Sequence, residues 1–472
     1  MRNRVVAALL FVGVSLGLYC AVPGLGTDED VAELMRQARR ARQDRDVAGS
    51  SADVAMIRLT ETLVAELNDR DWVVRDEKEP GFLVFPFRPK ASGEFPTHGD
   101  TSPDYHRTNP GFVGPNACAS CHPQKHAGVM RTAHGLTSRH ASKESVAGTH
   151  ASSKRLNVPD SSLQFTAEVE GEVPTQHVSF AGWETQIPMD ISIGSGKNGQ
   201  SYLFWVGDAL YQNHLSFLSA SNAWIHSPGY PVHGGMYGRE VGEGCLECHV
   251  TFVQRSKRPN HYFRDSAILG VTCERCHGPG REHVEYHQQN PETREPEFVS
   301  DPGKLSRQAQ LEICGQCHSG SFKLRSRAFA FRPGDMVAEH HQSLHEMDGV
   351  GTIHTSNQLT RLQRSKCFQL SEMTCTTCHD PHRHERGALD SFSARCLNCH
   401  SEQACKMQAS LGEQLSKDCI SCHMPTVANQ RMDISTTNGQ FSPPMIDHHI
   451  RVDSQATRDF LKTKVRGEPT PD

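Results

Sequence analysis

The order of apolar and polar positions predicts a helical start, a strand-rich middle and an irregular remainder. Apolar residues recur every three or four positions after Thr27 and Asp28, either of which can cap a helix that carries Val31, Leu34, Met35 and Ala38. The same spacing over residues 53–67 predicts a second helix with Val54, Ile57, Val64 and Leu67 on one face.

Alternation of apolar and polar residues follows these helical stretches. It predicts two short strands, DWVVRDE and GFLVFPF, separated by a turn at Pro80 and Gly81. A longer alternating stretch over residues 156–218 predicts an antiparallel β insert. From about Val241 the pattern predicts short helical or irregular segments, and after Thr426 it is polar and loop-like apart from MIDHHIRV.

The first residues have the features of an export signal. Arg2 and Arg4 form a positive start, and an apolar run from Val5 to about Tyr19 follows. We favour a cleaved signal, because the apolar run is short for a membrane span. An uncleaved membrane anchor stays open, since no A-x-A site follows and the residues before Cys20 make a poor lipidation motif. Both alternatives place the rest of the chain in the periplasm or elsewhere outside the cytoplasm.

Composition shows that the chain is poor in the residues that usually build a core. Only 36% of its 472 residues are hydrophobic and 7% are aromatic, which is thin for a chain long enough for two to four domains. Another apolar material is therefore expected to fill the interior. The net charge of -5 gives no indication of nucleic-acid binding, whereas 17 cysteines and 28 histidines are far above average.

Seven copies of Cys-x-x-Cys-His account for most of the cysteines. Two thiols three positions apart lie on one helical turn, where each can form a thioether to one haem, and the following histidine can ligate the iron. Zinc sites and disulfides also use cysteine pairs, but neither requires a histidine after every second cysteine. The sequence therefore predicts seven covalently bound haem c groups. The thioether cysteines are Cys118, Cys121, Cys245, Cys248, Cys273, Cys276, Cys314, Cys317, Cys375, Cys378, Cys396, Cys399, Cys419 and Cys422, and the proximal histidines are His122, His249, His277, His318, His379, His400 and His423.

Each iron also needs a second axial ligand, and 21 of the 28 histidines remain after the seven proximal ones. Any single one is equally well a surface histidine, but as a set they favour bis-histidine ligation, which gives low potentials and irons suited to electron transfer. Met424 is adjacent to its own proximal histidine and is badly placed to ligate the same iron. The candidate distal ligands are His134, His140, His283, His354, His382 and His448, and nearby alternatives are His287, His340, His341, His345, His384 and His449.

Three cysteines lie outside the motifs: Cys20 in the signal segment, Cys367 and Cys405. In an oxidising compartment, two such thiols near each other in the chain are expected to pair. A disulfide between Cys367 and Cys405 would bracket the fifth and sixth haem sites.

The segments around the motifs resemble a known family. ACASCHPQKHAGVMRTAHG resembles the opening haem segment of the tetrahaem cytochrome c-554-like family. GVTCERCHGPGREH, SKCFQLSEMTCTTCHDPH, CLNCH, DCISCHMP and DHHIRV resemble, in order, the blocks of a larger group of exported multihaem cytochromes that are often joined to tetratricopeptide repeats. IGSGKNGQSYLFWVGDALYQ and WIHSPGY are similar to the β insert of that group, so the resemblance covers about residues 112–452.

This resemblance implies a mostly α-helical and irregular multihaem cytochrome c fold, a haem-stack core that carries the antiparallel β insert. It implies axial roles for His134, His283, His354, His382 and His448, and it supports the pairing of Cys367 with Cys405. The sequence departs from the group in two respects. No tetratricopeptide repeat follows DHHIRV, and TTNGQF lacks a histidine that the group often has, which leaves one axial ligand in doubt.

Together, these patterns predict seven regions. They are a signal peptide or N-terminal membrane anchor (1–26), a small α+β segment (27–89), a polar linker (90–115), a first haem segment (116–155), the β insert (156–232), a six-haem core (233–452) and a polar tail (453–472).

Two functions fit these predictions. The favoured one is an exported electron-transfer protein of a respiratory chain, with redox proteins as donor and acceptor. The alternative is a multihaem oxidoreductase that acts on a small nitrogen or sulfur compound at one haem with an open distal face, since hydroxylamine-oxidising and nitrite-reducing relatives share this architecture. The sequence has no CxxCK site and no substrate-pocket motif, which favours electron transfer. A partner-docking role of the β insert is compatible with both.

Overall fold

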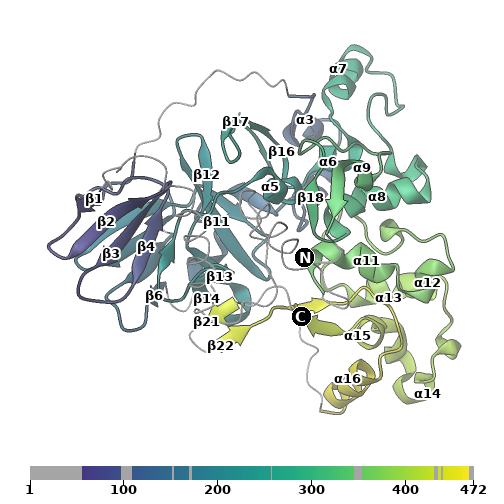
Figure 1. The fold of residues 1–472 in the computed structure, drawn as a ribbon. Helices are drawn as coiled ribbons and strands as arrows, with labels where there is room; N and C mark the ends of the chain where they lie inside the picture. Colours follow the sequence, from purple (N-terminus) through teal and green to yellow (C-terminus); the bar gives the residue numbers. More distant parts are fainter. Residues whose placement is uncertain are drawn as a thin grey trace, which may run out of the picture.

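The computed structural model describes residues 56–96, 109–150, 154–169, 173–256, 258–344, 353–429, 434–436 and 439–466. Within them, the large sheets gather on one side of the molecule and the short helices on the other (Figure 1). The predicted signal segment, Cys20, the helix expected after Thr27 and the candidate ligand His345 lie outside the described residues.

The first described residues form strands where a helix was predicted. Residues 53–67 contain β1 (Met56–Arg58) and most of β2 (Leu63–Asn68), which pair antiparallel, so the prediction of a second helix is wrong. Leu63, which is not on the predicted apolar helix face, is fully buried, whereas Leu67, which is on that face, is 37% exposed. The apolar residues of this stretch fit both periods, and burial against the neighbouring strands decides for the strand.

The two strands predicted around the Pro-Gly turn are confirmed. They are β3 (Asp71–Asp76) and β4 (Phe82–Phe85), which pair antiparallel on either side of Gly81. Gly81 has a φ of 117°, a conformation that glycine adopts without the strain of a Cβ atom. A late strand, β15 (Gly235–Met236), adds in parallel to β4 and completes a five-stranded sheet.

The stretch predicted as an antiparallel β insert forms two further sheets. One has four antiparallel strands in the order β6, β7, β8 and β9 (Arg155–Asn157, Gln164–Glu168, Thr175–Phe180 and Trp183–Pro188). The other has six strands, and it takes in β5 (Ser138–His140) from the first haem segment next to β10, β11, β12, β13 and β14 (Ile191–Ile193, Gly199–Val206, Ala209–Gln212, Leu215–Leu218 and Ala223–His226).

Aromatic and aliphatic side chains join the N-terminal strands to the β insert in one core. Phe85 of β4, Phe165 of β7 and Phe180 of β8 are fully buried in it. Tyr237 stacks on Phe85 with ring centroids 5.4 Å apart. A second core packs the six-stranded sheet against the second Cys-x-x-Cys-His motif. It includes Trp205, Leu246, Phe252 and Tyr262.

The other half of the molecule consists of short helices and turns. They include α3 (Asn116–Ala119), α4 (Pro123–Val129), α5 (Glu243–His249), α6 (Cys273–His277), α7 (Arg281–Gln289), α8 (Arg307–His318), α9 (Val337–His340), α11 (Gln358–Leu362), α12 (Lys366–Gln369), α13 (Leu389–Leu397), α14 (Gln408–Leu411), α15 (Ile420–His423) and α16 (Ser454–Arg466). Three small two-stranded sheets belong to this part of the described chain: β16–β17 (Val250–Arg255 and Tyr262–Leu269), β18–β19 (Phe322–Leu324 and His341–Ser343) and β20–β23 (Thr426–Ala428 and Pro444–Ile446). Another, β21–β22 (Ile434–Thr436 and Gly439–Phe441), packs on β14 of the six-stranded sheet.

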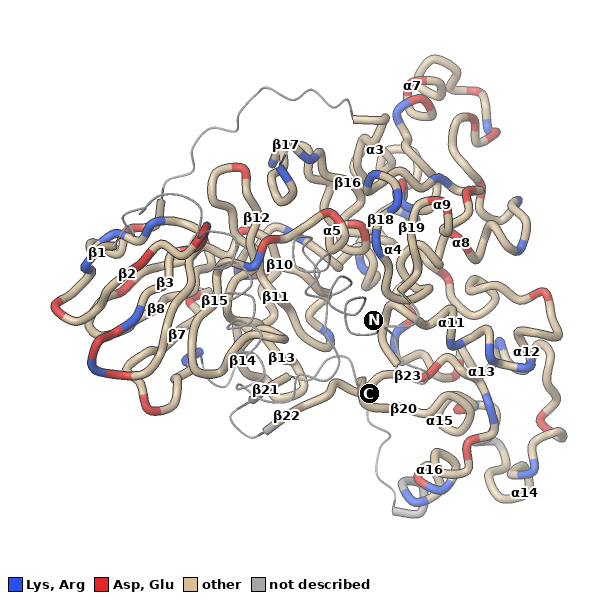
Figure 2. The backbone as a smooth tube through the Cα atoms, viewed as in Figure 1, with Lys and Arg blue, Asp and Glu red and all other residues tan. Residues whose placement is uncertain are grey.

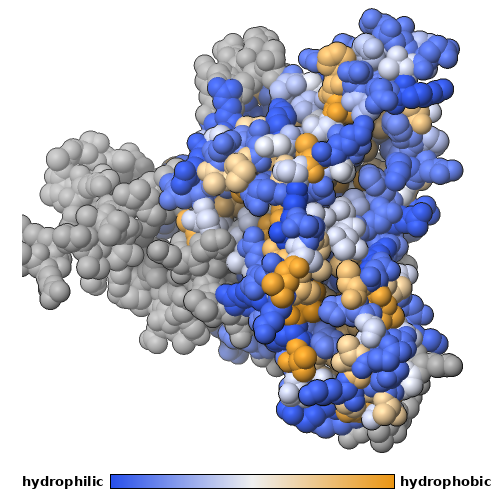
Figure 3. All heavy atoms as spheres, turned by 90° about the vertical axis from the view of Figure 1, so that its right-hand side faces the viewer, coloured by the Kyte–Doolittle hydropathy of each residue, from blue (hydrophilic) through white to orange (hydrophobic). Residues whose placement is uncertain are grey.

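Few apolar side chains are buried in this helical half. In the described residues from Cys273 to Asn429 they are Leu311, Ile313, Phe329, Phe331, Ile353, Leu359, Leu362 and Phe368. The face of this half is largely hydrophilic and carries separate apolar patches (Figure 3). Leu370 is 85% exposed, Val452 82% and Phe298 56%. Protein atoms alone therefore cover little apolar surface here, which fits the expectation that another apolar group completes this half.

Two predictions about the fold need correction. The chain is not mostly α-helical and irregular, because strands and helices contribute about equally to the described residues. The tail is not loop-like throughout either, since α16 packs on α15 and buries Phe460.

Acidic and basic residues are interspersed over both halves of the molecule (Figure 2). No helix within the described ranges is long and apolar enough to span a membrane.

Candidate haem-binding sites

The Cys-x-x-Cys-His motifs lie on short helical turns. The second and third lie within α5 and α6, and the fourth ends α8. In the first, fifth, sixth and seventh motifs, the backbone N–H of the histidine donates a hydrogen bond to the backbone carbonyl of the first cysteine, at 2.9 to 3.1 Å. A bond over four residues closes one helical turn, so both thiols and the histidine lie close together. All motif cysteines are free thiols, as thioether formation requires.

Four proximal histidines face a second imidazole from a distant part of the chain. The ring centroids are 6.5 Å apart for His122 and His283, and 6.1 Å apart for His318 and His134, for His277 and His382, and for His379 and His448. Two imidazoles on one iron have centroids about 6 Å apart, since a metal–nitrogen bond is about 2 Å and the nitrogen lies about 1 Å from its ring centre. The four pairs therefore have the separation that an iron between them needs.

Backbone carbonyls orient several of these rings. His277 Nδ1 lies 2.8 Å from the carbonyl oxygen of Ser300. His283 Nδ1 lies 2.8 Å from the carbonyl oxygen of Glu297, and His318 Nδ1 lies 2.7 Å from that of Thr355. A carbonyl can only accept a hydrogen bond, so Nδ1 carries the proton and Nε2 keeps its lone pair for a metal. This is the usual outer-shell arrangement of metal-binding histidines.

Burial keeps two of the distal imidazoles in the neutral form that binds metals. Burial first, and then the neighbouring His318 and His379, lower the pKa of His134 to about 4. Burial and His379 likewise lower the pKa of His448 to about 4, although the Ile446 carbonyl opposes this shift. Both rings are therefore deprotonated near pH 7 and can donate a lone pair to a metal.

The remaining candidate ligands have other surroundings. The Nδ1 atom of His354 lies 2.7 Å from Ser356 Oγ at the start of a 3-10 turn, and His340 contacts Asp335 at 2.9 Å. His140 and His384 are exposed, and the ring of His287 lies 4.5 Å from that of His283. Within the part of the chain that the structure describes, no second imidazole stands opposite His249, His400 or His423.

Thiols from different motifs contact each other and show which sites are neighbours. Cys118 hydrogen-bonds Cys273 and lowers its pKa to about 7, and Cys396 hydrogen-bonds Cys419 and lowers its pKa to about 6. The other two contacts join Cys248 to Cys317 and Cys314 to Cys375. The first site therefore adjoins the third, the fourth adjoins the second and the fifth, and the sixth adjoins the seventh.

Cys367 and Cys405 are both free thiols in the structure. Cys367 is near enough to Cys378 and Cys396 to influence their pKa values, whereas Cys405 acts on Cys422. The two thiols thus lie beside different haem sites, and the disulfide between them stays a prediction.

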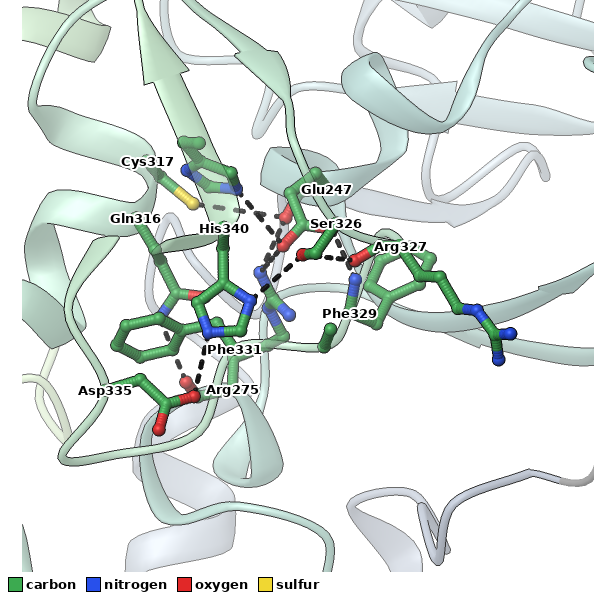
Figure 4. A network of polar contacts seen from close by, with 12 residues as sticks. Glu247, Arg275, Gln316, Cys317, Ser326, Arg327, Phe329, Phe331, Asp335 and His340 are labelled. Carbon is green, nitrogen blue, oxygen red and sulfur yellow. Dashed lines mark hydrogen bonds and ion pairs between the residues drawn. The ribbon is translucent and has the colours of Figure 1, made fainter. Parts of the chain in front are cut away.

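Sequence reasoning missed the residues that stand between the cysteines. Glu247 of the second motif and Arg275 of the third form a buried ion pair, in which Glu247 Oε1 and Arg275 Nη2 are 3.0 Å apart (Figure 4). Gln316 of the fourth motif donates a side-chain hydrogen bond to the backbone carbonyl of Arg275. Glu274 of the third motif accepts the backbone N–H groups of Val113 and Gly114, just before the first motif. A charged residue within a motif was the available signal, but only the tertiary structure supplies its partner.

Comparisons with known proteins match parts of this chain to cytochromes. Residues 235–278, which contain the second and third motifs, match the model of the family "Cytochrome c554 and c-prime". A multiheme cytochrome MtrA of Shewanella baltica is 24% identical over 194 residues, 36% of this chain and 55% of the relative. The dissimilatory sulfite reductase MccA of Wolinella succinogenes is 22% identical over 385 residues, 66% of this chain and 50% of the relative. The chain thus spans about half the length of these curated relatives.

A solved structure, that of the outer cell wall cytochrome OcwA, aligns with 76% of this chain and 82% of its own, with a TM-score of 0.45 and 16% identity. The motifs and the sequence relatives define the class: this chain is a multihaem c-type cytochrome, a protein that binds haem c. Its second and third haem motifs carry the pattern of the cytochrome c554 family.

Proposed function

We propose that this chain attaches seven haem c groups, one at each motif, and conducts electrons between redox proteins outside the cytoplasm, as part of a respiratory chain. The observation that carries the proposal is the set of four opposed imidazole pairs, each made of a motif histidine and a histidine far away in the sequence. When bound, haem supplies a reversible one-electron couple. The two imidazoles of each pair would hold the iron, and two strong nitrogen ligands would lower its potential and limit reorganisation.

Contacts between the motifs support a continuous path. Beyond the thiol contacts given above, Cys317 of the fourth motif acts on the pKa of Cys276 in the third, and Cys399 of the sixth acts on that of Cys378 in the fifth. The path then runs through the first, third, fourth, fifth, sixth and seventh sites, and the second site branches from the fourth. The export signal at Arg2 to Tyr19 supports the extracytoplasmic location.

Haem stoichiometry tests the first part of this proposal. A pyridine haemochrome assay and intact mass should give about seven haems per chain after full maturation. A mature protein with five or fewer would contradict it.

Carbon monoxide binding tests the axial ligands. His382 faces His277, whereas His384, two residues later, is exposed. In the reduced protein, His382→Ala should open one iron and produce a carbon monoxide shift of the Soret band, and the matched control His384→Ala should not. Equal behaviour of the two variants would contradict ligation by His382.

A second function, reduction of a small sulfur or nitrogen compound, is favoured by one observation. One relative, 22% identical over the matched residues, is a dissimilatory sulfite reductase. An iron with an exchangeable sixth position would bind carbon monoxide without any substitution. The electron-transfer proposal expects no Soret shift in the unmodified reduced protein, and a clear shift accompanied by a high-spin ferric signal in electron paramagnetic resonance would favour the enzyme.

A further inference from the structure

The buried ion pair between Glu247 and Arg275 lies where three haem sites meet. Glu247 belongs to the second motif and Arg275 to the third, and the Cys317 thiol of the fourth motif lies 4.0 Å from the Glu247 carbonyl (Figure 4). The side chains of the pair are only 1% and 3% exposed. No other described ion pair joins the inner residues of two motifs.

The carboxylate is held in its charged form by several donors. Arg275 Nη2 donates to Glu247 Oε1 at 3.0 Å, and the Phe329 N–H donates to Oε2 at 2.6 Å. His341 lies 3.8 Å from Oε1 and is itself stacked on Phe322. The guanidinium and the backbone N–H group thus both donate to the carboxylate, and these contacts are those of a charged acid beside a charged base.

Water screens this pair little, because neither side chain reaches the surface. The pair is part of the second and third motifs, and the fourth motif contacts both of its members: Gln316 donates to the Arg275 carbonyl at 3.2 Å and the Cys317 thiol lies 4.0 Å from the Glu247 carbonyl. A charge that interacts with a thiol also interacts with the haem joined to it. In a buried environment such an interaction changes a haem's reduction equilibrium.

We infer that the charges of Glu247 and Arg275 set the reduction potentials of the haems at the second, third and fourth sites. This inference rests on the proposed function. Together the two charges nearly cancel, so neither charge alone shifts the potentials of the three haems. Removing one charge unbalances all three sites at once, and the sign of the shift depends on which charge is left.

Three conservative variants test this inference in the full, matured protein. Glu247→Gln leaves an unpaired positive charge, which stabilises an added electron and raises the potentials. Arg275→Gln leaves an unpaired negative charge, which lowers them. The double variant restores neutrality and should return them close to the wild type. For each single variant, we expect the ratio of reduced to oxidised haem at these sites to change about tenfold at a fixed applied potential, which is about 59 mV for a one-electron couple.

Spectroelectrochemical titration provides the measurement, and Glu77→Gln is the matched control. Glu77 pairs with Arg58 at 3.0 Å on the exposed surface of the β half, so neutralising it should leave every potential unchanged. Haem content is determined in each variant, so that failure of the two proposals can be told apart. Five or fewer haems in the matured wild type would refute the proposed function.

With haem content unchanged, potentials that do not move, or that move in the same direction in both single variants, would overturn the inference and leave the pair a merely structural contact. If Arg275→Gln fails to fold, Glu247→Gln and the double variant still decide, because the first must raise the potentials and the second must reverse that rise. Loss of haem in Glu247→Gln would also overturn the inference, since the pair would then serve haem attachment.

Discussion

Replacing Asp447 by asparagine is expected to destabilise the protein by roughly 3–5 kcal/mol, because it removes the carboxylate that pairs with the buried guanidinium of Arg361. Asp447 is fully buried. It accepts Arg361 Nε at 2.8 Å, Arg361 Nη2 at 2.7 Å and Arg451 Nη1 at 2.7 Å. Arg361 is 7% exposed, so water cannot replace the lost partner, and an amide cannot accept in the same two-pronged way.

The same substitution should reach two haem sites. Asp447 directly precedes His448, which faces His379. The carbonyl oxygen of Arg451, four residues after Asp447, lies 3.0 Å from Nδ1 of His423, the proximal histidine of the seventh motif. A displaced Asp447 segment therefore loosens an imidazole at the fifth site and the orientation of another at the seventh. We expect carbon monoxide binding to the reduced variant at temperatures where it is still folded.

Urea unfolding of the matured protein, followed by circular dichroism in the Soret band, measures the loss of stability. Asp459→Asn is the matched control: Asp459 lies on α16, is 55% exposed and pairs with Lys462 at 3.3 Å. This exposed pair should contribute at most about 0.5 kcal/mol. If Asp447→Asn costs no more than Asp459→Asn, the argument that this buried cluster fixes the segment is refuted.

Four further predictions follow from the same structure. In the reduced protein, His448→Ala should produce a carbon monoxide shift of the Soret band and His449→Ala should not, because only His448 faces a proximal imidazole; a shift in both variants would contradict this assignment. Expression without cytochrome c maturation should yield unfolded or degraded chain, because the helical half buries few apolar residues of its own; a soluble apoprotein that melts cooperatively would be inconsistent with this. Peptide mapping without reductant should find Cys367 and Cys405 joined if the predicted disulfide forms, and two free thiols would end that prediction. Burial, aided by Glu240 and opposed by Arg70, raises the pKa of Asp71 to about 6, above the unfolded value of about 3.9. The stability of the wild type relative to Asp71→Asn should therefore fall as the pH rises from about 4 to 6, which leaves the variant roughly 2–3 kcal/mol more stable at pH 7. No pH dependence of this difference in urea titrations would contradict the burial of the carboxylate.

The sequence by itself determined the chemistry that is local in the chain. Two cysteines and a histidine within five residues share one helical turn whatever the surroundings, so the haem motifs could be predicted residue by residue. The β insert was predictable for a similar reason, because alternation of apolar and polar residues is a local property of strands. Where the local pattern was ambiguous, as at residues 53–67, the prediction was wrong, since burial of Leu63 against neighbouring strands decides between helix and strand.

Only the tertiary structure decided which histidines face each other. The resemblance to exported multihaem cytochromes singled out His134 and His382, but not that they stand opposite His318 and His277. The partners are more than a hundred residues apart, and no local pattern encodes such a distance. The same holds for the ion pair of Glu247 and Arg275, whose two charges belong to different motifs. The pair is buried because these motifs pack against each other. The sequence shows that both charges exist, and only the fold brings them into contact and excludes water from them.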